Sequence, residues 1–252
     1  MNITFLGTGT SQGVPIINCD CSVCTSVNPK NKRMRCSVMV QDNGKNILID
    51  TSTDLRTQFL AYPFERIDAI LYTHAHADHI LGLDDLRRFN YIQKEIIPAY
   101  GDQNTLKRLK QIFGYAFSEG ELQPGVPSIS GQTVDAGFEI YGIKVIPVPL
   151  LHGNDTVFGY RIGNFAYCTD VNKIPQKSYA LLRNLDVLVI GALQHRRHDK
   201  HFSVNEALIE AEKIWAKKTY FTHIGHKVDH ETDGRNLPDY CEFAYDGLCI
   251  EI

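Results

Sequence analysis

The stretch His74-Ala75-His76-Ala77-Asp78-His79 places four metal-binding side chains within six residues. It directly follows the apolar run 69–72, which predicts a buried β-strand. In an extended backbone the first two histidines point to the same side, so both imidazoles can reach one ion. Where the chain turns into a helix predicted near 80–89, the aspartate and the last histidine swing towards a second ion. The segment therefore predicts two neighbouring metal sites at the end of a strand.

Further ligands must come from elsewhere in the chain, because a catalytic zinc-like ion takes about four ligands and keeps one position for water. Three candidates, His152, Asp170 and His223, each come just after a predicted strand. The carboxyl ends of strands are where α/β proteins collect their sites. These three residues are therefore the candidates that complete the two metal sites.

Short apolar strands alternate with helical stretches along the chain, which indicates an α/β fold. Strand-like runs occur at 47–49, 69–72, 144–146, 165–168 and 186–190, and helical ones at 53–61, 102–113, 175–184 and 204–216. Turn residues at Asn43-Gly44 and Tyr141-Gly142 predict antiparallel hairpins. Many hairpins combined with outer helices favour a sandwich of two sheets.

Local signals refine this picture. Ser203 and Glu206 have capping-box spacing, so a helix is expected to begin just after His201. The stretch 124–131 is rich in Gly, Pro and Ser and predicts a surface loop. With 252 residues, 43% of them hydrophobic, the chain can bury one substantial core. We expect a single domain spanning residues 1–252.

Charge and cysteine content indicate the compartment and the class of partner. A net charge of -3 gives no global attraction to polyanions, and no apolar run approaches the roughly 18 residues of a membrane span. Of seven cysteines, three lie in Cys19-Asp20-Cys21-Ser22-Val23-Cys24, a spacing suited to metal ligands rather than disulfides. Nothing near Met1 looks like an export signal. We therefore expect a cytoplasmic protein without membrane contact.

The metal-ligand set as a whole resembles the signature of the metallo-β-lactamase superfamily. The resemblance implies a four-layer αββα sandwich, with two divalent ions, zinc or manganese, in the active site. It assigns the following residues: His74, His76 and His152 to one ion; Asp78, His79 and His223 to the other; Asp170 as the bridge; and Asp50, after an early strand, as a residue whose hydrogen bond orients a ligand imidazole. Such a pair of ions lowers the pKa of a bridging water to give hydroxide. Because Asp78 and Asp170 would hold these ions, the resemblance also makes them part of the catalytic set.

The segment His201-Phe202-Ser203 resembles the histidine motif of the phosphodiesterase branch of this superfamily. The resemblance implies that His201 assists the leaving group, which a phosphodiester requires. The nearby side chains of Arg196 and Arg197 could bind phosphate, and Ser203 at a helix start could add backbone N–H groups to an anion site. A solvated loop is the alternative for this basic segment.

The cysteine cluster resembles the family of phosphoribosyl 1,2-cyclic phosphate phosphodiesterases of phosphonate breakdown. The resemblance implies one structural zinc held by Cys19, Cys21, Cys24 and His226. The other cysteines fall in or near predicted strands and are expected to be packing residues: Cys36, Cys168, Cys241 and Cys249.

The leading hypothesis is a dinuclear phosphodiesterase acting on a small cyclic or nucleotide-like phosphodiester. One alternative is a ribonuclease Z-like tRNA 3′-end endonuclease. Such enzymes usually carry a protruding arm or a basic exosite for tRNA, but the stretch 101–131 has few basic residues and no lysine- and glycine-rich insertion of that kind is seen. Nucleic acid is therefore a possible partner but not the favoured one. A lactone or thioester hydrolase on the same metals, or a non-catalytic zinc-stabilised binding module, are further alternatives. The hydrophobic segment 92–100 could pack internally or at a homodimer interface.

Overall fold

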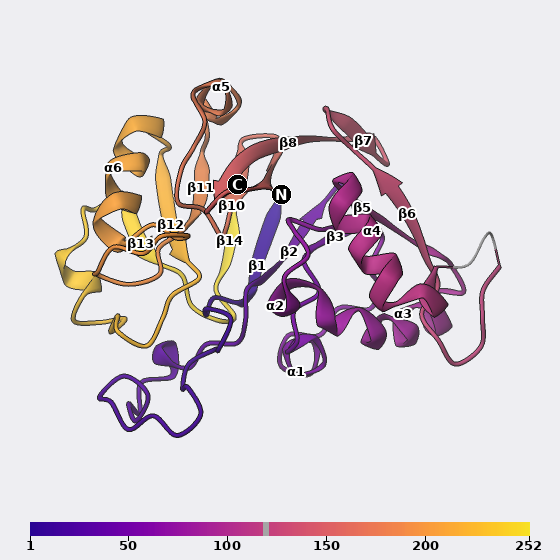
Figure 1. Cartoon of the computed structure of the whole chain (residues 1–252), viewed down its shortest axis with the longest axis horizontal. Coiled ribbons are helices and arrows are strands. Elements are labelled where there is room, and N and C mark those ends of the chain that lie inside the picture. Colours follow the sequence, from indigo (N-terminus) through magenta and orange to yellow (C-terminus); the bar gives the residue numbers. More distant parts are fainter. Residues whose placement is uncertain (118–120) are drawn as a thin grey trace.

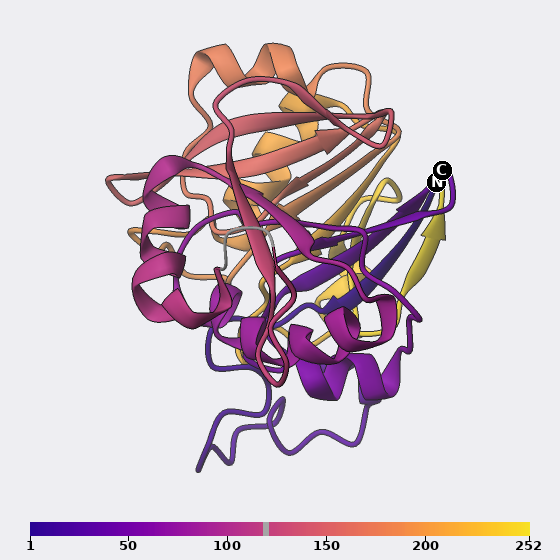
Figure 2. The same ribbon diagram turned by 90° about the vertical axis from the view of Figure 1, so that its right-hand side faces the viewer.

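Two mixed sheets of seven strands each pack face to face in the computed structural model, and helices cover both outer faces (Figure 1). The structure describes residues 1–117 and 121–252. Figure 2 shows the layers from the side, with the helices of the first half of the chain below and those of the second half above. The predicted four-layer αββα sandwich is confirmed.

The first sheet contains the N-terminal strands and has the order β14-β1-β2-β3-β4-β5-β6. The strands from β3 to β6 are parallel to one another. Their bounds, in sheet order, are β14 (Cys249–Glu251), β1 (Asn2–Gly7), β2 (Ser37–Asp42), β3 (Lys45–Ile49), β4 (Ala69–Leu71), β5 (Ile97–Gly101) and β6 (Ile129–Thr133).

The second sheet has the order β13-β12-β11-β10-β9-β8-β7, and its strands from β10 to β13 are parallel. Their bounds are β13 (Cys241–Phe243), β12 (Lys218–Thr222), β11 (Val187–Gly191), β10 (Phe165–Cys168), β9 (Asp155–Ile162), β8 (Ile143–His152) and β7 (Phe138–Ile140). Because parallel strands share a direction, the carboxyl ends within each parallel group meet at one edge.

Helices fill the outer layers. The α-helices are α1 (Leu55–Ala61), α2 (Ala77–Ile80), α3 (Arg87–Gln93), α4 (Gln103–Ile112), α5 (Gln176–Tyr179) and α6 (Val204–Ile214), and the 3-10 helices are η1 (Pro29–Asn31), η2 (Leu81–Leu86), η3 (Gly114–Ala116), η4 (Ala180–Leu182) and η5 (Gly234–Asn236). Among the described residues, no helix has both the length and the apolar character needed to cross a membrane.

The central strands are apolar on both faces because each face packs against a different layer. In β3, Ile47 and Ile49 face the second sheet, whereas Leu48 packs with the helical layer. In β11, Val189 points between the sheets and Leu188 points towards the layer of α6. Side chains alternate between the faces of a strand, so a strand covered on both sides must be apolar throughout. This explains why the runs found in the sequence are continuous rather than alternating.

Most predicted elements are confirmed. The hairpins form at Asn43-Gly44 and Tyr141-Gly142, and all four of these turn residues have positive φ. Ser203 caps α6 in a complete capping box with Glu206. The helices expected at 53–61, 102–113 and 204–216 correspond to α1, α4 and α6.

Four expectations about local structure were wrong. The loop expected at 124–131 ends early, because buried Ile129 starts β6 and pairs with Ile97 of β5. The helix expected near 80–89 is divided among α2, η2 and α3, and that expected at 175–184 is divided between α5 and η4. Cys249 is exposed, since β14 is an edge strand, whereas the other three cysteines expected to pack are buried.

Gly82 allows η2 to lie against the segment before α1. A Cβ atom at this position would lie 2.0 Å from the carbonyl oxygen of Ser52 and 2.7 Å from Cβ of Leu55. We predict that Gly82→Ala lowers the free energy of unfolding by about 1–3 kcal/mol, because backbone must move to relieve the overlap. Gly114→Ala is the matched control, because a Cβ atom added there would have nothing within 4 Å; it should change stability by less than about 0.5 kcal/mol. Urea unfolding of both variants tests this, and equal effects would contradict it.

Candidate metal centre

The side chains predicted to bind metal come together where strands of both sheets end. The segment His74–His79 follows β4, and Asp50 follows β3 in the same sheet. From the second sheet, His152 ends β8, while Asp170 and His223 come just after β10 and β12. The parallel arrangement thus brings residues far apart in the sequence to one edge.

Three of these residues leave their strands with an unusual backbone. Asp50, Asp170 and His223 have φ angles of 62°, 49° and 57°, in the left-handed region. A non-glycine residue seldom adopts this conformation, and such residues gather at functional sites because the surrounding structure holds them there.

One group of ligands is formed by three histidines. The possible ligand atoms of His74, His76 and His152 lie within 4.8 Å of one another, and His76 is exposed. The ring of His152 is fixed by its Nδ1, 2.8 Å from the carbonyl oxygen of Lys200. With Nδ1 donating to that carbonyl, Nε2 keeps its lone pair for a metal ion.

A second group consists of Asp78, His79 and His223, whose possible ligand atoms also lie within 4.8 Å of one another. Asp78 Oδ2 lies 3.2 Å from His79 Nε2 and 3.8 Å from His223 Nε2. All three residues are buried. They lie near the histidine triplet but are distinct from it.

Asp170 lies between the two groups. Its Oδ2 is 3.0 Å from His79 Nε2, its Oδ1 is 3.3 Å from His223 Nε2, and it also gathers with His74. A carboxylate has two oxygens and can contact two ions at once. Its position therefore suits a bridging ligand.

Asp50 contacts the second ligand group through the ring of His79. Its Oδ2 lies 2.7 Å from His79 Nδ1, and its two oxygens accept hydrogen bonds of 2.8 Å from the backbone amide and hydroxyl of Thr73. With Asp50 holding Nδ1, the Nε2 atom of His79 points to the ligand cluster. Thr73 was not singled out in the sequence, although its hydroxyl immediately precedes the histidine motif.

His201 lies against both groups. Its ring stacks on that of His223, with centroids 4.7 Å apart and planes inclined by 13°, and it meets the ring of His152 edge-on at 4.6 Å. Its Nδ1 is 3.7 Å from Asp170 Oδ1. Burial and the charge of His223 lower the pKa of His201 to about 3, so the imidazole is neutral at neutral pH in this arrangement.

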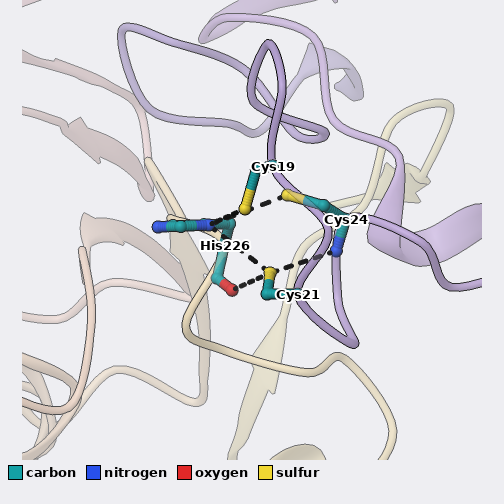
Figure 3. A group of neighbouring side chains, drawn as sticks. All are labelled: Cys19, Cys21, Cys24 and His226. Atoms are coloured by element: carbon teal, nitrogen blue, oxygen red, sulfur yellow. Dashed lines mark hydrogen bonds between the residues drawn. The ribbon is translucent and has the colours of Figure 1, made fainter.

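A separate cluster forms where the N-terminal loop (residues 10–33) meets the segment after β12 (Figure 3). His226 Nδ1 lies 3.2, 3.5 and 3.7 Å from the sulfur atoms of Cys19, Cys21 and Cys24. Ligand atoms on a tetrahedral zinc lie about 3.6 Å apart, given Zn–S and Zn–N bonds of about 2.3 and 2.0 Å. The four side chains therefore fit a zinc ion without rearrangement.

Comparison with known proteins identifies the family. Residues 45–224 match the family model described as a β-lactamase superfamily domain. The chain belongs to the β-lactamase superfamily. The crystal structure of a new diphosphatase from the PhnP family is similar to it, with a TM-score of 0.93 and 44% identity over 100% of this chain and 97% of that chain.

Two curated relatives are longer. An octanoyltransferase of Porphyromonas gingivalis is 34% identical over 98% of this chain and 51% of its own length. A ribonuclease Z of Bradyrhizobium diazoefficiens is 28% identical over 63% of this chain and 48% of its own length. The chain thus spans about half the length of these relatives. The chain has the metallo-β-lactamase fold.

The charges at the centre fit the divalent ions of this superfamily. Burial opposes ionisation of Asp170, but His223 and His79 outweigh it and hold the pKa of that carboxyl well below its usual range. Burial, with the charge of His79, holds the pKa of His74 well below its usual range as well. Buried Nε2 atoms of His74, His79 and His223 have no hydrogen-bond partner among the described residues. Nε2 of His79 and of His223 lies 3.0–3.8 Å from carboxylate oxygens of Asp78 and Asp170 without forming a hydrogen bond, and a cation between these groups would satisfy nitrogen and oxygen atoms together.

The residues predicted to bind substrate are Arg196, Arg197 and Ser203, and they differ in exposure and in contacts. Arg196 is exposed, and Arg197, also exposed, has its Nε 3.8 Å from Glu206 Oε1. Ser203 is buried, and both its amide and its hydroxyl donate to Glu206 in the helix cap. Because the cap occupies these groups, the structure gives no support to a substrate contact by Ser203.

The contact between Asp50 and His79 predicts a specific effect on metal binding. Asp50→Asn should weaken binding at the second ligand group by about 10–100-fold, because an amide no longer fixes the ring of His79 in one orientation. Chelator competition monitored by metal analysis measures this. Asp68→Asn is the matched control, since Asp68 is another buried aspartate but lies at the opposite end of β4, paired with Lys45 and Arg66. Equal metal affinities in the two variants would contradict the assignment.

Proposed function

We propose that this chain is a dinuclear metal-dependent phosphodiesterase that hydrolyses a small cyclic or nucleotide-like phosphodiester. The observation that carries the proposal is the arrangement of two ligand groups around one shared carboxylate, Asp170, with His201 stacked beside them. A hydrolase of phosphate esters requires such a paired site together with a group that can assist the leaving oxygen.

In this proposal the histidine triplet of His74, His76 and His152 holds one divalent ion, zinc or manganese. The group of Asp78, His79 and His223 holds the other, and Asp170 contacts both. Two ions bound there would supply Lewis acidity and lower the pKa of a water molecule, the chemistry typical of such pairs. Asp50 keeps the ring of His79 in place, and exposed His76 marks the side from which the substrate enters.

His201 would act on the departing oxygen. A neutral imidazole carries one N–H, which can donate a hydrogen bond to the leaving oxygen; to transfer a proton to that oxygen the ring must first take one up and become an imidazolium. The ring is held by its stacking on His223 and lies within reach of Asp170, whose carboxylate stabilises a positive charge that develops on the ring. Arg196 and Arg197 remain candidates for binding the rest of the substrate.

A second candidate substrate is a diphosphate, which is favoured by the 44% identity to a diphosphatase of the PhnP family. Like the diester, a diphosphate presents a negatively charged phosphoryl group with an oxygen leaving group. The ribonuclease Z relatives suggest a nucleic-acid substrate, but their identity to this chain is lower, between 22% and 28% in three of them. The octanoyltransferase contains much sequence outside the match, so its name supports no activity for this chain.

The four-residue cluster of the N-terminal loop would hold a structural zinc. A hydrogen bond from the backbone amide of Cys24 lowers the pKa of the Cys21 thiol to about 6, although burial opposes it. This thiol is therefore ionised at neutral pH, as a zinc ligand must be. All four positions of a tetrahedral ion would be filled by protein, so the site has no room for catalysis.

We also propose a domain extent, a compartment and a homodimer interface. Residues 1–252 would form the hydrolase domain, and the seven cysteines, none of them in a disulfide, are compatible with a reducing cytoplasm. In the segment 92–100, considered for a homodimer, Ile97 and Ala99 are buried in the sheet. Ile92 at the start of this segment and its neighbour Tyr91 are exposed. A homodimer would therefore use the end of α3 rather than β5.

His201→Ala tests the function directly. We expect kcat for bis(p-nitrophenyl) phosphate to fall by about 10²–10⁴-fold, the usual contribution of a general acid, while both active-site ions are retained. Turnover and metal content are measured on the same metal-loaded preparations. If the variant also lost an ion, His201 would be a ligand, since it gathers with His152 and Asp170 in the structure.

The wild type is assayed in parallel with the diester, a phosphate monoester, a diphosphate and a lactone. Diester turnover above the others supports the proposal, and dominant diphosphate turnover selects the second candidate. Lactone turnover without either diester or diphosphate turnover would refute both.

Cys21→Ser tests the structural zinc. We expect the metal content to fall by one ion per chain and the free energy of unfolding to decrease, because a structural zinc contributes directly to folding. Cys249→Ser is the matched control, since this exposed thiol lies outside the cluster. Metal analysis and thermal unfolding of the two variants give the answer, and an unchanged metal count in Cys21→Ser would exclude the site.

A further inference from the structure

A pocket of about 520 Å³ lies outside the metal centre, between the N-terminal loop and Tyr245–Asp246. Arg33 lines this pocket and is only 3% exposed. Burial lowers the pKa of Arg33 to about 10, so the guanidinium is still charged at neutral pH. Buried charges in proteins are normally paired with an opposite charge.

The partners of Arg33 are all neutral. Its Nη1 donates to the hydroxyl of Thr8 at 2.7 Å and to the carbonyl of Ala244 at 2.6 Å, and its Nη2 lies 3.2 Å from Nδ1 of His230. Burial and the neighbouring Arg33 lower the pKa of His230 to about 4, so this ring is neutral. In the described part of the chain, no carboxylate oxygen lies within 4.0 Å of the guanidinium.

The carboxylates nearest to this charge are engaged with other donors. Asp246 accepts hydrogen bonds from the hydroxyl of Thr8 at 2.7 Å and the backbone amide of Met34 at 2.6 Å. Asp229 accepts one from the side-chain amide of Asn31 at 2.7 Å. Both act on Arg33 only at longer range. The guanidinium therefore lacks the direct ion pair that its burial requires.

The pocket lining as a whole is positive. Lys30 and Lys32 line it together with Arg33, and both lysines are exposed. The fourth cation of the lining, Arg35, is paired with Asp54 at 2.8 Å. The two lysines have no carboxylate partner among the described residues: Lys30 Nζ lies 4.2 Å from the centre of the Tyr245 ring, and Lys32 Nζ donates to the carbonyl of Cys24 at 2.9 Å. This charge balance favours an anionic ligand.

The pocket is close to the metal centre but does not share its residues. Asp54 in its wall follows Thr53, whose hydroxyl donates to the carbonyl of Ala77 at 3.3 Å. Ala77 immediately precedes Asp78 of the second ligand group. None of the candidate metal ligands lines the pocket. A ligand bound here would occupy a separate site beside the metal centre.

We propose that this pocket binds the phosphate group of a small phosphorylated molecule, with Arg33 as the buried anchor and Lys30 and Lys32 at the mouth. The planar N–H fork of arginine matches phosphate oxygens, and lysine adds charge without fixed geometry. The volume lies within the range of about 300–1,000 Å³ typical of small-molecule sites. The proposal does not depend on the phosphodiesterase activity.

The test is calorimetric titration of inorganic phosphate, and separately of glycerol 3-phosphate, into the metal-loaded protein. In the wild type we expect a binding event in addition to any at the metals. Lys30→Ala should weaken this event by about tenfold, the effect of one lost charge-assisted contact, and Arg33→Gln should abolish it. Lys107→Ala on α4 is the matched control, since it removes an exposed lysine outside the pocket and should change nothing.

Equal phosphate affinity in Lys30→Ala and Lys107→Ala would overturn the proposal and leave Arg33 as a purely structural residue. Circular dichroism shows whether Arg33→Gln folds; if it does not, a Lys30→Ala variant that also carries Lys32→Ala decides, because both lysines are exposed. Glycerol 3-phosphate should bind more tightly than inorganic phosphate, whereas the reverse order would mean a site for the free ion and would contradict the proposal. Diester turnover in the same variants separates the two sites, because it should persist when phosphate binding in the pocket is lost.

Discussion

The buried carboxylate of Asp170, held between imidazoles from both sheets, is the interaction on which the centre depends. Its two oxygens face His79, which lies in α2 and is held by Asp50, and His223, which lies just after β12. Removing a carboxylate from water is unfavourable unless positive groups or hydrogen bonds surround it. The two sheets must therefore close against each other with their strand ends aligned, and the apolar layer between them provides that alignment.

The sandwich of two sheets could be predicted from the sequence, because strands and hairpins leave local patterns, and the residues proposed as ligands do come together at its edge. A histidine-rich segment after an apolar strand fixes one side of the centre, and continuous apolar runs predict strands covered on both faces. The contacts that orient the ligands could not be predicted in the same way. The carbonyl of Lys200 that holds His152 is a backbone group, and no residue type at position 200 indicates its role.

Other differences between the prediction and the structure arise where the residue types are compatible with more than one local structure. Ser130 and Gly131 are typical loop residues, yet they belong to β6, because an edge strand needs only one buried side chain such as Ile129 to anchor it. Ser203 was expected to contact substrate, but a hydroxyl at a helix start is equally suited to capping, and Glu206 three residues later takes it. For β6 the pairing with β5 decided between loop and strand, whereas Ser203 makes the predicted local contact with Glu206 and its role in substrate binding stays a prediction.

The left-handed backbone of Asp50, Asp170 and His223 has an evolutionary consequence. At each of these three positions glycine would relieve the strain, so drift towards greater stability favours residues that cannot bind metal. Selection for function must act against this drift continually. A descendant released from that selection would first change these three residues, two proposed metal ligands and the aspartate that orients His79, while keeping the sandwich intact. Relatives that have become inactive should therefore be recognisable by glycine or asparagine after β3, β10 and β12.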